Sequence, residues 1–380
     1  MSKTFRIFNR FSILVVICCV FPNCHLDNII DIITNPDNVS TPCPTYEWEY
    51  RTPAEVGFDV DKWDEWVNSM TLTGHDSWGQ NPEDNFGLVI TKDGYIVAEF
   101  GNVDMTSQQS ASVGKAFAGL TIQLAIDKGL LNSADDPIQD YWTGEGELDH
   151  PDKYMDQGFH QEITFRNLDE MRGGFPISNG WRWSNCQQVP AWADCSGSPS
   201  DDNFAHRPPG EYHYSSGGRW RLHQALTKVI GTTMKEFLDQ ELFCKIGIKA
   251  EDWRIESGQV LHDSLDWYPN MPGYGLFCDP PYIIDGHEVQ GGGGWVFMSA
   301  KDLAKIAQLV ANQGAWNGEQ VISNTDFLYN HNGGNGSSLW GDPSTGIACG
   351  QVTTLGIKNA QNLSEAVLYI SSAKLDNLLE

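Results

Sequence analysis

The chain has 380 residues, of which 40% are hydrophobic, and its 50 acidic and 24 basic side chains give a formal net charge of −26. A chain of this length can bury a sizeable core, and we expect one large two-part domain. The acidic balance argues against nucleic acid and anionic membrane surfaces as partners, because both carry charge of the same sign.

The first 26 residues have the pattern of a secretory signal peptide. Basic MSKTFRIFNRF precedes the apolar run SILVVICCVF, which is too short to span a bilayer. We therefore expect a secreted, extracellular protein that meets a membrane only if this segment stays uncleaved. Residues 27–52 are polar and contain several prolines, which predicts an arm or linker, and residues 53–380 form the predicted domain.

Cysteine usage fits an exported protein better than a metal site. Cys186 and Cys195 flank a tryptophan-rich loop and are the first disulfide pair that we predict. No Cys-x-x-Cys occurs, and His287-Glu288 has no second histidine four residues on, so His287 is interpreted as an ordinary loop histidine. We expect neither a metal nor an organic cofactor.

The first elements after the arm are a helix over residues 60–70 and a hairpin over residues 87–100. Asp93-Gly94 between two apolar runs is a strong hairpin signal, because both residues tolerate the positive φ of a tight turn.

Ser112 and Lys115 open an apolar stretch that predicts a core helix, because hydrophobic residues surround it on every side. Three residues apart, the two side chains share one helical face. A lysine enclosed by apolar neighbours loses its proton readily, and a neutral amine beside a hydroxyl is a base beside a nucleophile. From this segment alone a second interpretation stays open, in which Ser112 caps the helix and Lys115 extends to solvent. Another Ser-x-x-Lys, Ser371 to Lys374, precedes a polar end and predicts only a surface helix start.

Two later segments add to this pattern. Tyr214, Ser215 and Ser216 lie in a turn before a predicted helix over residues 219–229, where several hydroxyls can face one cleft; a packed tyrosine beside a serine cap is the structural alternative. The glycine run at 291–294 leads into a predicted strand, then a capping box at Ser299 and Asp302 and a helix that ends at Gly314. No Gly-Lys-Ser/Thr follows the run, so it is not a phosphate loop.

In this order the segments resemble the β-lactamase-related serine hydrolases: class C β-lactamases, penicillin-binding DD-peptidases, and related esterases and amidases. The resemblance implies an α/β fold of the α+β type. An antiparallel sheet would be built from both chain ends and flanked by helices, with a helical insertion at about residues 111–285 and the cleft between the two parts. C-terminal strands are expected at 294–298, 347–355 and 366–370.

The resemblance also assigns roles. It implies that Ser112 is the acylated nucleophile, Lys115 its base, and Tyr214 the residue that passes the proton to the leaving group. Ser216 stands where the family usually has a substrate-binding asparagine, and a hydroxyl cannot reproduce both ends of an amide. The third family motif, Lys- or His-Thr-Gly, has no good copy; Ser344-Thr345-Gly346 is nearest, and the Gly346–Gln351 stretch resembles a Gly-Gly-Gln variant. We therefore expect the oxyanion N–H groups at Ser112 and Gly350.

Three functions follow as hypotheses. The first is a secreted serine hydrolase that cleaves a small-molecule ester or small amide through an acyl-serine intermediate. The second is a catalytically silent relative that acts as a secreted binding or scaffold protein, motivated by Ser216 and the missing third motif. The third, within enzymes, is a β-lactamase or D-alanyl-D-alanine peptidase, which the change to Ser216 disfavours.

Overall fold

The computed structural model describes residues 44, 46–69, 86–106, 110–175, 205–263, 280–323, 330–333, 336–353 and 378–379. The chain divides into two compact units, 1–43 and 44–380, and all described residues lie in the second. Within these ranges no helix is both long and apolar enough to cross a bilayer. The predicted signal peptide, the Cys186–Cys195 pair and the strand at 366–370 lie outside the described residues.

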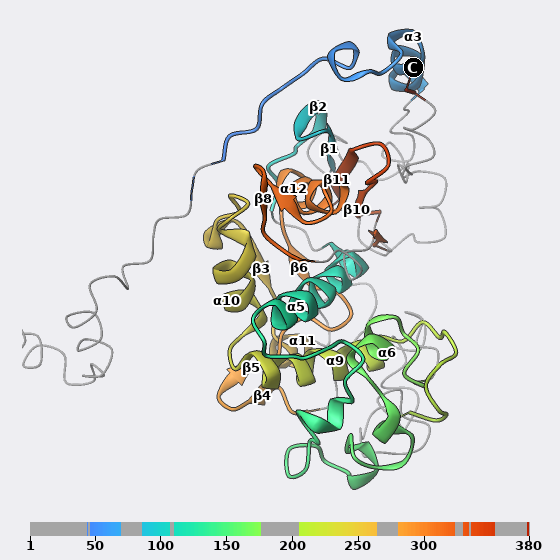
Figure 1. Ribbon diagram of the computed structural model, residues 1–380, viewed down its shortest axis with the longest axis vertical. Coiled ribbons are helices and arrows are strands. Elements are labelled where there is room, and N and C mark those ends of the chain that lie inside the picture. The colour runs from blue at the N-terminus through green and yellow to red at the C-terminus, as the bar shows by residue number, and fades with distance from the viewer. Residues whose placement is uncertain are drawn as a thin grey trace, which may run out of the picture. The chain divides into compact units, whose positions relative to one another are not determined.

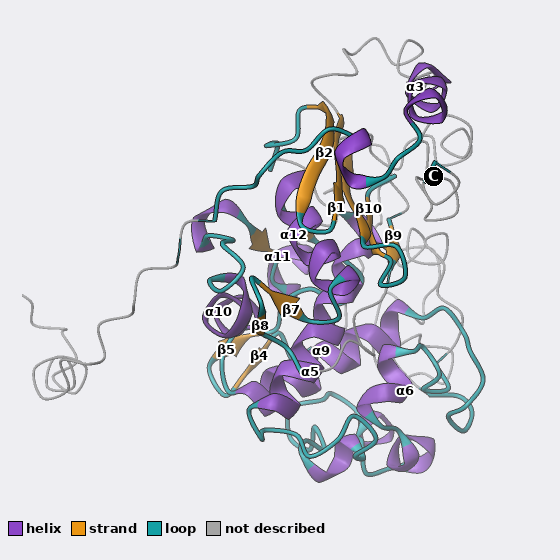
Figure 2. Cartoon of the chain, turned by 45° about the horizontal axis from the view of Figure 1, so that its top comes forward, coloured by secondary structure: helices purple, strands orange, loops and turns teal. Residues whose placement is uncertain are grey.

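The main sheet is antiparallel and has the strand order β2-β1-β11-β10-β9 (Figure 2). Two strands come from the N-terminal part of the domain and three from the C-terminal part, as predicted for a sheet built from both chain ends. Their bounds are β1 Phe86–Lys92, β2 Tyr95–Gly101, β9 His331–Asn332, β10 Ser338–Gly341 and β11 Ile347–Thr353.

The β1–β2 hairpin turns at the predicted dipeptide. Asp93 and Gly94 both have positive φ, 53° and 89°, between the paired residues Lys92 and Tyr95. This is the two-residue turn whose twist matches that of the flanking strands. The hairpin prediction is therefore confirmed to within a residue at each end.

Helix α12, Ala300–Ala311, covers one face of the sheet and packs on β1, β10 and β11 (Figure 1). Ser299 caps it by accepting the Asp302 N–H at 3.0 Å. Gly341 and Gly350 let the helix backbone approach the strands: a Cβ built on Gly350 would lie 2.3 Å from the Ala300 carbonyl oxygen. The helix predicted before Gly314 is confirmed.

The opposite face of the sheet packs against the N-terminal helix α3, Val60–Ser69, and the described C-terminal residues. Their shared cluster buries aromatic and aliphatic side chains from both ends of the chain: Phe58, Trp63, Leu88, Ile90, Trp340, Cys349 and Leu378. Asp59 N–H donates to the Leu378 carbonyl at 2.8 Å, which ties the ends together directly. Cys349 is a free, buried thiol.

Apart from the short turn η2, the remaining helices lie in the predicted helical part, which comes between β2 and β9 in the sequence. Helix α5 is buried from Ala116 to Ala125, as its apolar surface requires, and it packs against α9, which in turn packs on α6 and α10. The bounds are α5 Ala116–Asp127, α6 Phe165–Asp169, α9 Ser216–Ile230, α10 Met234–Leu238 and α11 Gly258–Asp263, with short turns η2 Ala54–Val56, η4 Ala111–Lys115, η5 Ile138–Asp140, η6 Pro151–Lys153, η7 Gly158–Glu162, η8 Asp239–Phe243 and η9 Ala250–Asp252.

Three two-stranded ribbons complete the described part of the fold: β3 Arg254–Ile255 with β6 Val296–Phe297, β4 Ile283–Ile284 with β5 His287–Glu288, and β7 Ala315–Trp316 with β8 Glu319–Gln320. The strand predicted at 294–298 is thus shortened to β6 and lies outside the main sheet. Positive φ at Gly294 and Trp295, 156° and 71°, prevents an earlier start. His287 lies in β5 rather than in a loop.

Candidate active site

Ser112 and Lys115 lie on η4, a tight turn that runs directly into α5. In a 3₁₀ turn, side chains three residues apart lie above one another. The Lys115 Nζ donates to the Ser112 Oγ at 3.0 Å. Lys115 is 0% exposed, so it does not extend to solvent, and no side chain caps α5 at its start. The structural alternative for this segment is therefore wrong.

The glycine run passes against this turn by direct backbone contact. A Cβ on Gly114 would lie 2.8 Å from the Gly294 carbonyl carbon, and a Cβ on Gly294 would lie 2.2 Å from the Ala111 carbonyl oxygen. Only glycine fits on both sides of such an approach. As a result the Gly293 carbonyl accepts a hydrogen bond from the Lys115 Nζ. The run shapes the environment of the lysine.

Tyr214 directly precedes Ser215, the N-cap of α9, and its side chain extends to Ser112. Ser215 caps that helix by accepting the Gly218 N–H at 3.0 Å, which orients the preceding turn. The Tyr214 Oη and the Ser112 Oγ share a hydrogen bond of 2.8 Å, and the Lys115 Nζ lies 5.2 Å from the centre of the Tyr214 ring. The structure thus brings Ser112, Lys115 and Tyr214 together, although 102 positions separate the serine from the tyrosine.

The surroundings of Lys115 favour an uncharged amine. Burial lowers the pKa of Lys115, and the positive charge of Arg219 adds to this, against the opposing effect of Tyr214. Among the described residues, its hydrogen-bond partners are a hydroxyl and a carbonyl, and none is a carboxylate. A neutral amine has two hydrogens and one lone pair; while the Gly293 carbonyl binds one hydrogen, the lone pair can accept the serine proton.

Tyr214 experiences opposing effects. Burial raises the pKa of Tyr214, but the Lys115 charge and the hydrogen bond from Ser112 outweigh it, so that the net shift is downward. The lowering by Lys115 operates only while its amine is protonated, so the phenol is most acidic after Lys115 has taken up the serine proton, which is when Tyr214 has to donate to the leaving group.

Ser216 is the first residue of α9, two positions beyond Tyr214, and its side chain is buried. Its contact with a substrate stays a prediction.

Gly350 does not lie where the expected oxyanion site requires. It is in β11, the central strand of the sheet, opposite Val89 on one side and Leu339 on the other, and it is packed under α12. The Ser344-Thr345-Gly346 turn lies at the end of the sheet where Lys92 donates to the Thr345 carbonyl at 2.9 Å. Because β11 is paired along both of its edges at Gly350, the structure does not support the predicted oxyanion N–H there.

Strand β9, an edge strand of the main sheet, packs against η4, as does β6 of the small ribbon. The residues of β9 are His331 and Asn332, and Gly333 follows, so a His-x-Gly sequence lies beside η4. Burial, with the Lys115 charge, lowers the pKa of His331 to about 3, which keeps its ring neutral. We missed this His-x-Gly sequence because we looked for threonine at its middle position. A histidine two residues before a glycine, ahead of the predicted strand at 347–355, was the available signal.

No cluster of three histidine, cysteine or acidic side chains suited to a metal ion occurs among the described residues.

A family profile described as Beta-lactamase matches residues 86–371. The chain belongs to the Beta-lactamase family. Members of this family are mostly serine hydrolases. A search of curated protein sequences found no match.

Solved structures show the same fold at low sequence identity. A Bacillus anthracis protein described as a 6-aminohexanoate-dimer hydrolase is 14% identical, with a TM-score of 0.54 over 89% of this chain and 87% of the other. A Bacteroides dorei protein described as a β-lactamase is 13% identical, with a TM-score of 0.55 over 84% of this chain and 99% of the other. At such identities the likeness concerns the fold alone.

Proposed function

We propose that the protein is a secreted serine hydrolase that cleaves an ester or a small amide through an acyl-serine intermediate. The observation that carries the proposal is the hydrogen-bonded chain Lys115–Ser112–Tyr214, in which the amine is buried without a carboxylate partner. Family membership supports the hydrolase class. Secretion is supported by the signal-like first 26 residues.

The chemistry proceeds in two steps. The Ser112 oxygen attacks the substrate carbonyl while its proton moves to Lys115, and the resulting tetrahedral oxyanion collapses. The carbonyl-to-leaving-group bond breaks, Tyr214 donates its proton to the departing oxygen or nitrogen, and Lys115 returns a proton to Tyr214. Water then adds to the acyl-serine with proton transfer to the same pair, which releases the acid and restores Ser112.

Ser216 favours esters and small amides over β-lactams and D-alanyl peptides. A hydroxyl presents its donor and its acceptor from a single oxygen atom, whereas the usual asparagine presents an NH₂ donor and a carbonyl acceptor on two separate atoms to a substrate amide. An ester with a good leaving group depends least on that second contact.

The test is covalent labelling of the full chain with a fluorophosphonate probe. We expect the wild-type protein to be labelled and Ser112→Ala to lose the label. Ser371→Ala, which alters the other Ser-x-x-Lys, is the matched control and keeps it. A folded wild-type protein that takes up no label and hydrolyses no p-nitrophenyl ester would refute the hydrolase and favour the silent, binding relative.

Substrate class is tested separately. We expect hydrolysis of p-nitrophenyl esters with no turnover of nitrocefin or of a D-alanyl-D-alanine peptide. Turnover of nitrocefin at a rate comparable with the esters would instead identify a β-lactamase.

A further inference from the structure

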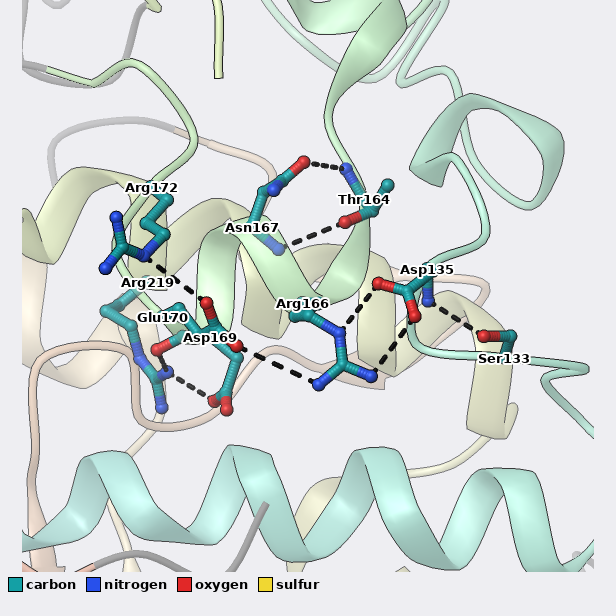
Figure 3. A network of polar contacts seen from close by, with 9 residues as sticks. All are labelled: Ser133, Asp135, Thr164, Arg166, Asn167, Asp169, Glu170, Arg172 and Arg219. Carbon is teal, nitrogen blue, oxygen red and sulfur yellow. Dashed lines mark hydrogen bonds and ion pairs between the residues drawn. The ribbon is translucent and has the colours of Figure 1, made fainter. Parts of the chain in front are cut away.

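Arg219 is a buried cation that lies behind the catalytic lysine. It is 0% exposed and belongs to α9, five residues beyond Tyr214. Its Nη1 donates to the Asp169 Oδ1 at 2.5 Å and to the Asp169 carbonyl at 2.7 Å, while its Nη2 donates to the main-chain carbonyl of Lys115. Figure 3 shows the arginine reaching Asp169 at the end of α6.

The other ion pairs near α6 differ from this one by their exposure. Arg166 bridges Asp135 and Glu170 with side chains that are 33%, 62% and 44% exposed (Figure 3). Exposed pairs of this kind contribute little to stability, whereas a buried guanidinium must have its donors satisfied. Among the ion pairs drawn in Figure 3, the Arg219–Asp169 pair is thus the buried one.

The residues that follow Asp169 also hydrogen-bond to the segment that precedes Tyr214. The His213 N–H donates to the Met171 carbonyl at 2.9 Å, and the Gly210 N–H donates to the Arg172 carbonyl at 2.8 Å. Asp169 therefore starts a stretch that pairs with the turn carrying the tyrosine, while Arg219 joins the same residue to the lysine.

We propose that Arg219, paired with Asp169, is a positioning residue that fixes the main chain of Lys115 between α6 and α9, so that its amine points at Ser112 and Tyr214. The inference rests on the proposed function for its catalytic meaning. A guanidinium suits the role because its planar fork donates in two directions at once. A lysine at this position cannot span the same acceptors with one nitrogen.

The charge of Arg219 has a second effect on Lys115. The titratable or charged groups that face this region are Tyr214, Arg219 and His223 from the α9 segment, Asp169 from α6, and His331 from β9. Burial lowers the pKa of His223 to about 3, and that of His331 lies at a similar value, so both rings are neutral at working pH. Arg219 and Asp169 then remain as an opposed pair next to a neutral Lys115, and removing the cation alone leaves a negative charge that favours protonated lysine.

The experiment measures pH profiles of ester hydrolysis for Arg219→Met, Arg219→Lys and the double variant Arg219→Met/Asp169→Leu, with Arg166→Met as control. We expect Arg219→Met to move the acidic limb of kcat/KM to higher pH by at least about one unit, which is a tenfold loss on that limb. In the double variant the acidic limb of kcat/KM should return to its wild-type pH. Its kcat should stay reduced, because the Lys115 carbonyl still lacks the hydrogen-bond donor. Arg219→Lys should keep the limb and lower kcat, and Arg166→Met should change neither.

A second readout does not depend on activity. Protein labelled with ¹³C at the lysine ε-carbon gives a Lys115 resonance, assigned by its absence in Lys115→Met, whose titration reports the amine directly. We expect it to titrate at higher pH in Arg219→Met than in the wild type, even if the wild type hydrolyses nothing. The inference is overturned if the Lys115 titration and kcat of the folded Arg219→Met and Arg219→Lys variants match those of Arg166→Met.

Discussion

Lys115 at the start of α5 and Lys305 in the middle of α12 are both buried, and the fold treats them in opposite ways. Lys305, 7% exposed, donates to the Asp302 carboxylate at 2.9 Å and to the Gly247 carbonyl at 2.6 Å. Lys115, 0% exposed, also binds a main-chain carbonyl, but its other partner is the Ser112 hydroxyl. The difference between the two sites is one carboxylate.

This difference shows how a fold sets the charge of an amine. A carboxylate compensates the charge of Lys305, so that the residue can serve as a structural cation that joins α12 to the Gly247 carbonyl. At Lys115 the glycine run brings backbone instead of an acidic side chain, and the Asp169 carboxylate is paired with Arg219. Burial without compensation leaves the uncharged amine favoured, and that is the form that a base requires.

The largest expected effects come from exchanging each lysine for methionine. Lys115→Met should lower kcat/KM by about 10²–10⁴-fold, because the base is lost. It should also raise the thermal unfolding midpoint, since an amine that resists burial is replaced by an apolar side chain. Lys305→Met should lower the free energy of unfolding by about 3–5 kcal/mol by leaving Asp302 unpaired, with little change in activity per folded molecule. Ester assays and thermal melts check both.

The sign of the stability change depends on pH. Because the folded protein lowers the pKa of Lys115 below its unfolded value, stability from this group is lost as pH falls through the folded pKa and is regained as pH rises. The gain in Lys115→Met should therefore be larger at acidic than at alkaline pH. If Lys115→Met and Lys305→Met changed the free energy of unfolding by the same amount at every pH, the contrast between the two lysines would be refuted.

The pH dependence of the wild-type enzyme gives the second prediction. The base works unprotonated, so kcat/KM should fall about tenfold per pH unit below the pKa of Lys115 and reach its plateau at a lower pH than an ordinary lysine allows. The histidines His223 and His331, both with a pKa of about 3, should add no inflection between pH 5 and 8. An inflection near pH 6.5 that survives in Lys115→Met would point to a different base.

Removal of the phenol oxygen should have the next largest effect. Tyr214→Phe loses the 2.8 Å hydrogen bond to Ser112 and the proton path to the leaving group, and we expect a decrease in kcat of about 10²-fold. Tyr212→Phe is the matched control, because that side chain is 55% exposed, and it should leave kcat unchanged. Equal rates for both variants in an ester assay would remove Tyr214 from the mechanism.

The smallest effect is expected from a change in the backbone contact between Gly114 and Gly294, which lies beside Lys115. A Cβ in Gly114→Ala meets the Gly294 backbone, and we expect a loss of about 1–3 kcal/mol in the free energy of unfolding together with reduced kcat. Gly231→Ala has open space but a φ of +64°, and it should cost about 1 kcal/mol with no change in kcat. Chemical denaturation and ester hydrolysis of both variants separate a loss of stability from a displaced lysine.

The local elements were predictable because their determinants are contiguous in the sequence. Asp93-Gly94 specifies its own turn, and Ser299 with Asp302 specifies the start of α12. The Ser112–Lys115 spacing and the apolar stretch after it predicted a buried helix, which the structure has as η4 and α5. In each case a few neighbouring residues are enough to determine the element.

The sequence by itself therefore determined the class of fold, the family and the three residues Ser112, Lys115 and Tyr214 of the candidate site. The tertiary structure decided whether Lys115 is enclosed or solvated, that Arg219 lies behind it, and that β9 rather than β11 faces Ser112. Strand order and burial depend on how segments hundreds of residues apart pack, and no local pattern encodes them. A two-residue strand such as β9 is specified by its neighbours in the sheet, which is why His331 escaped a reading of motifs and Gly350 was misplaced.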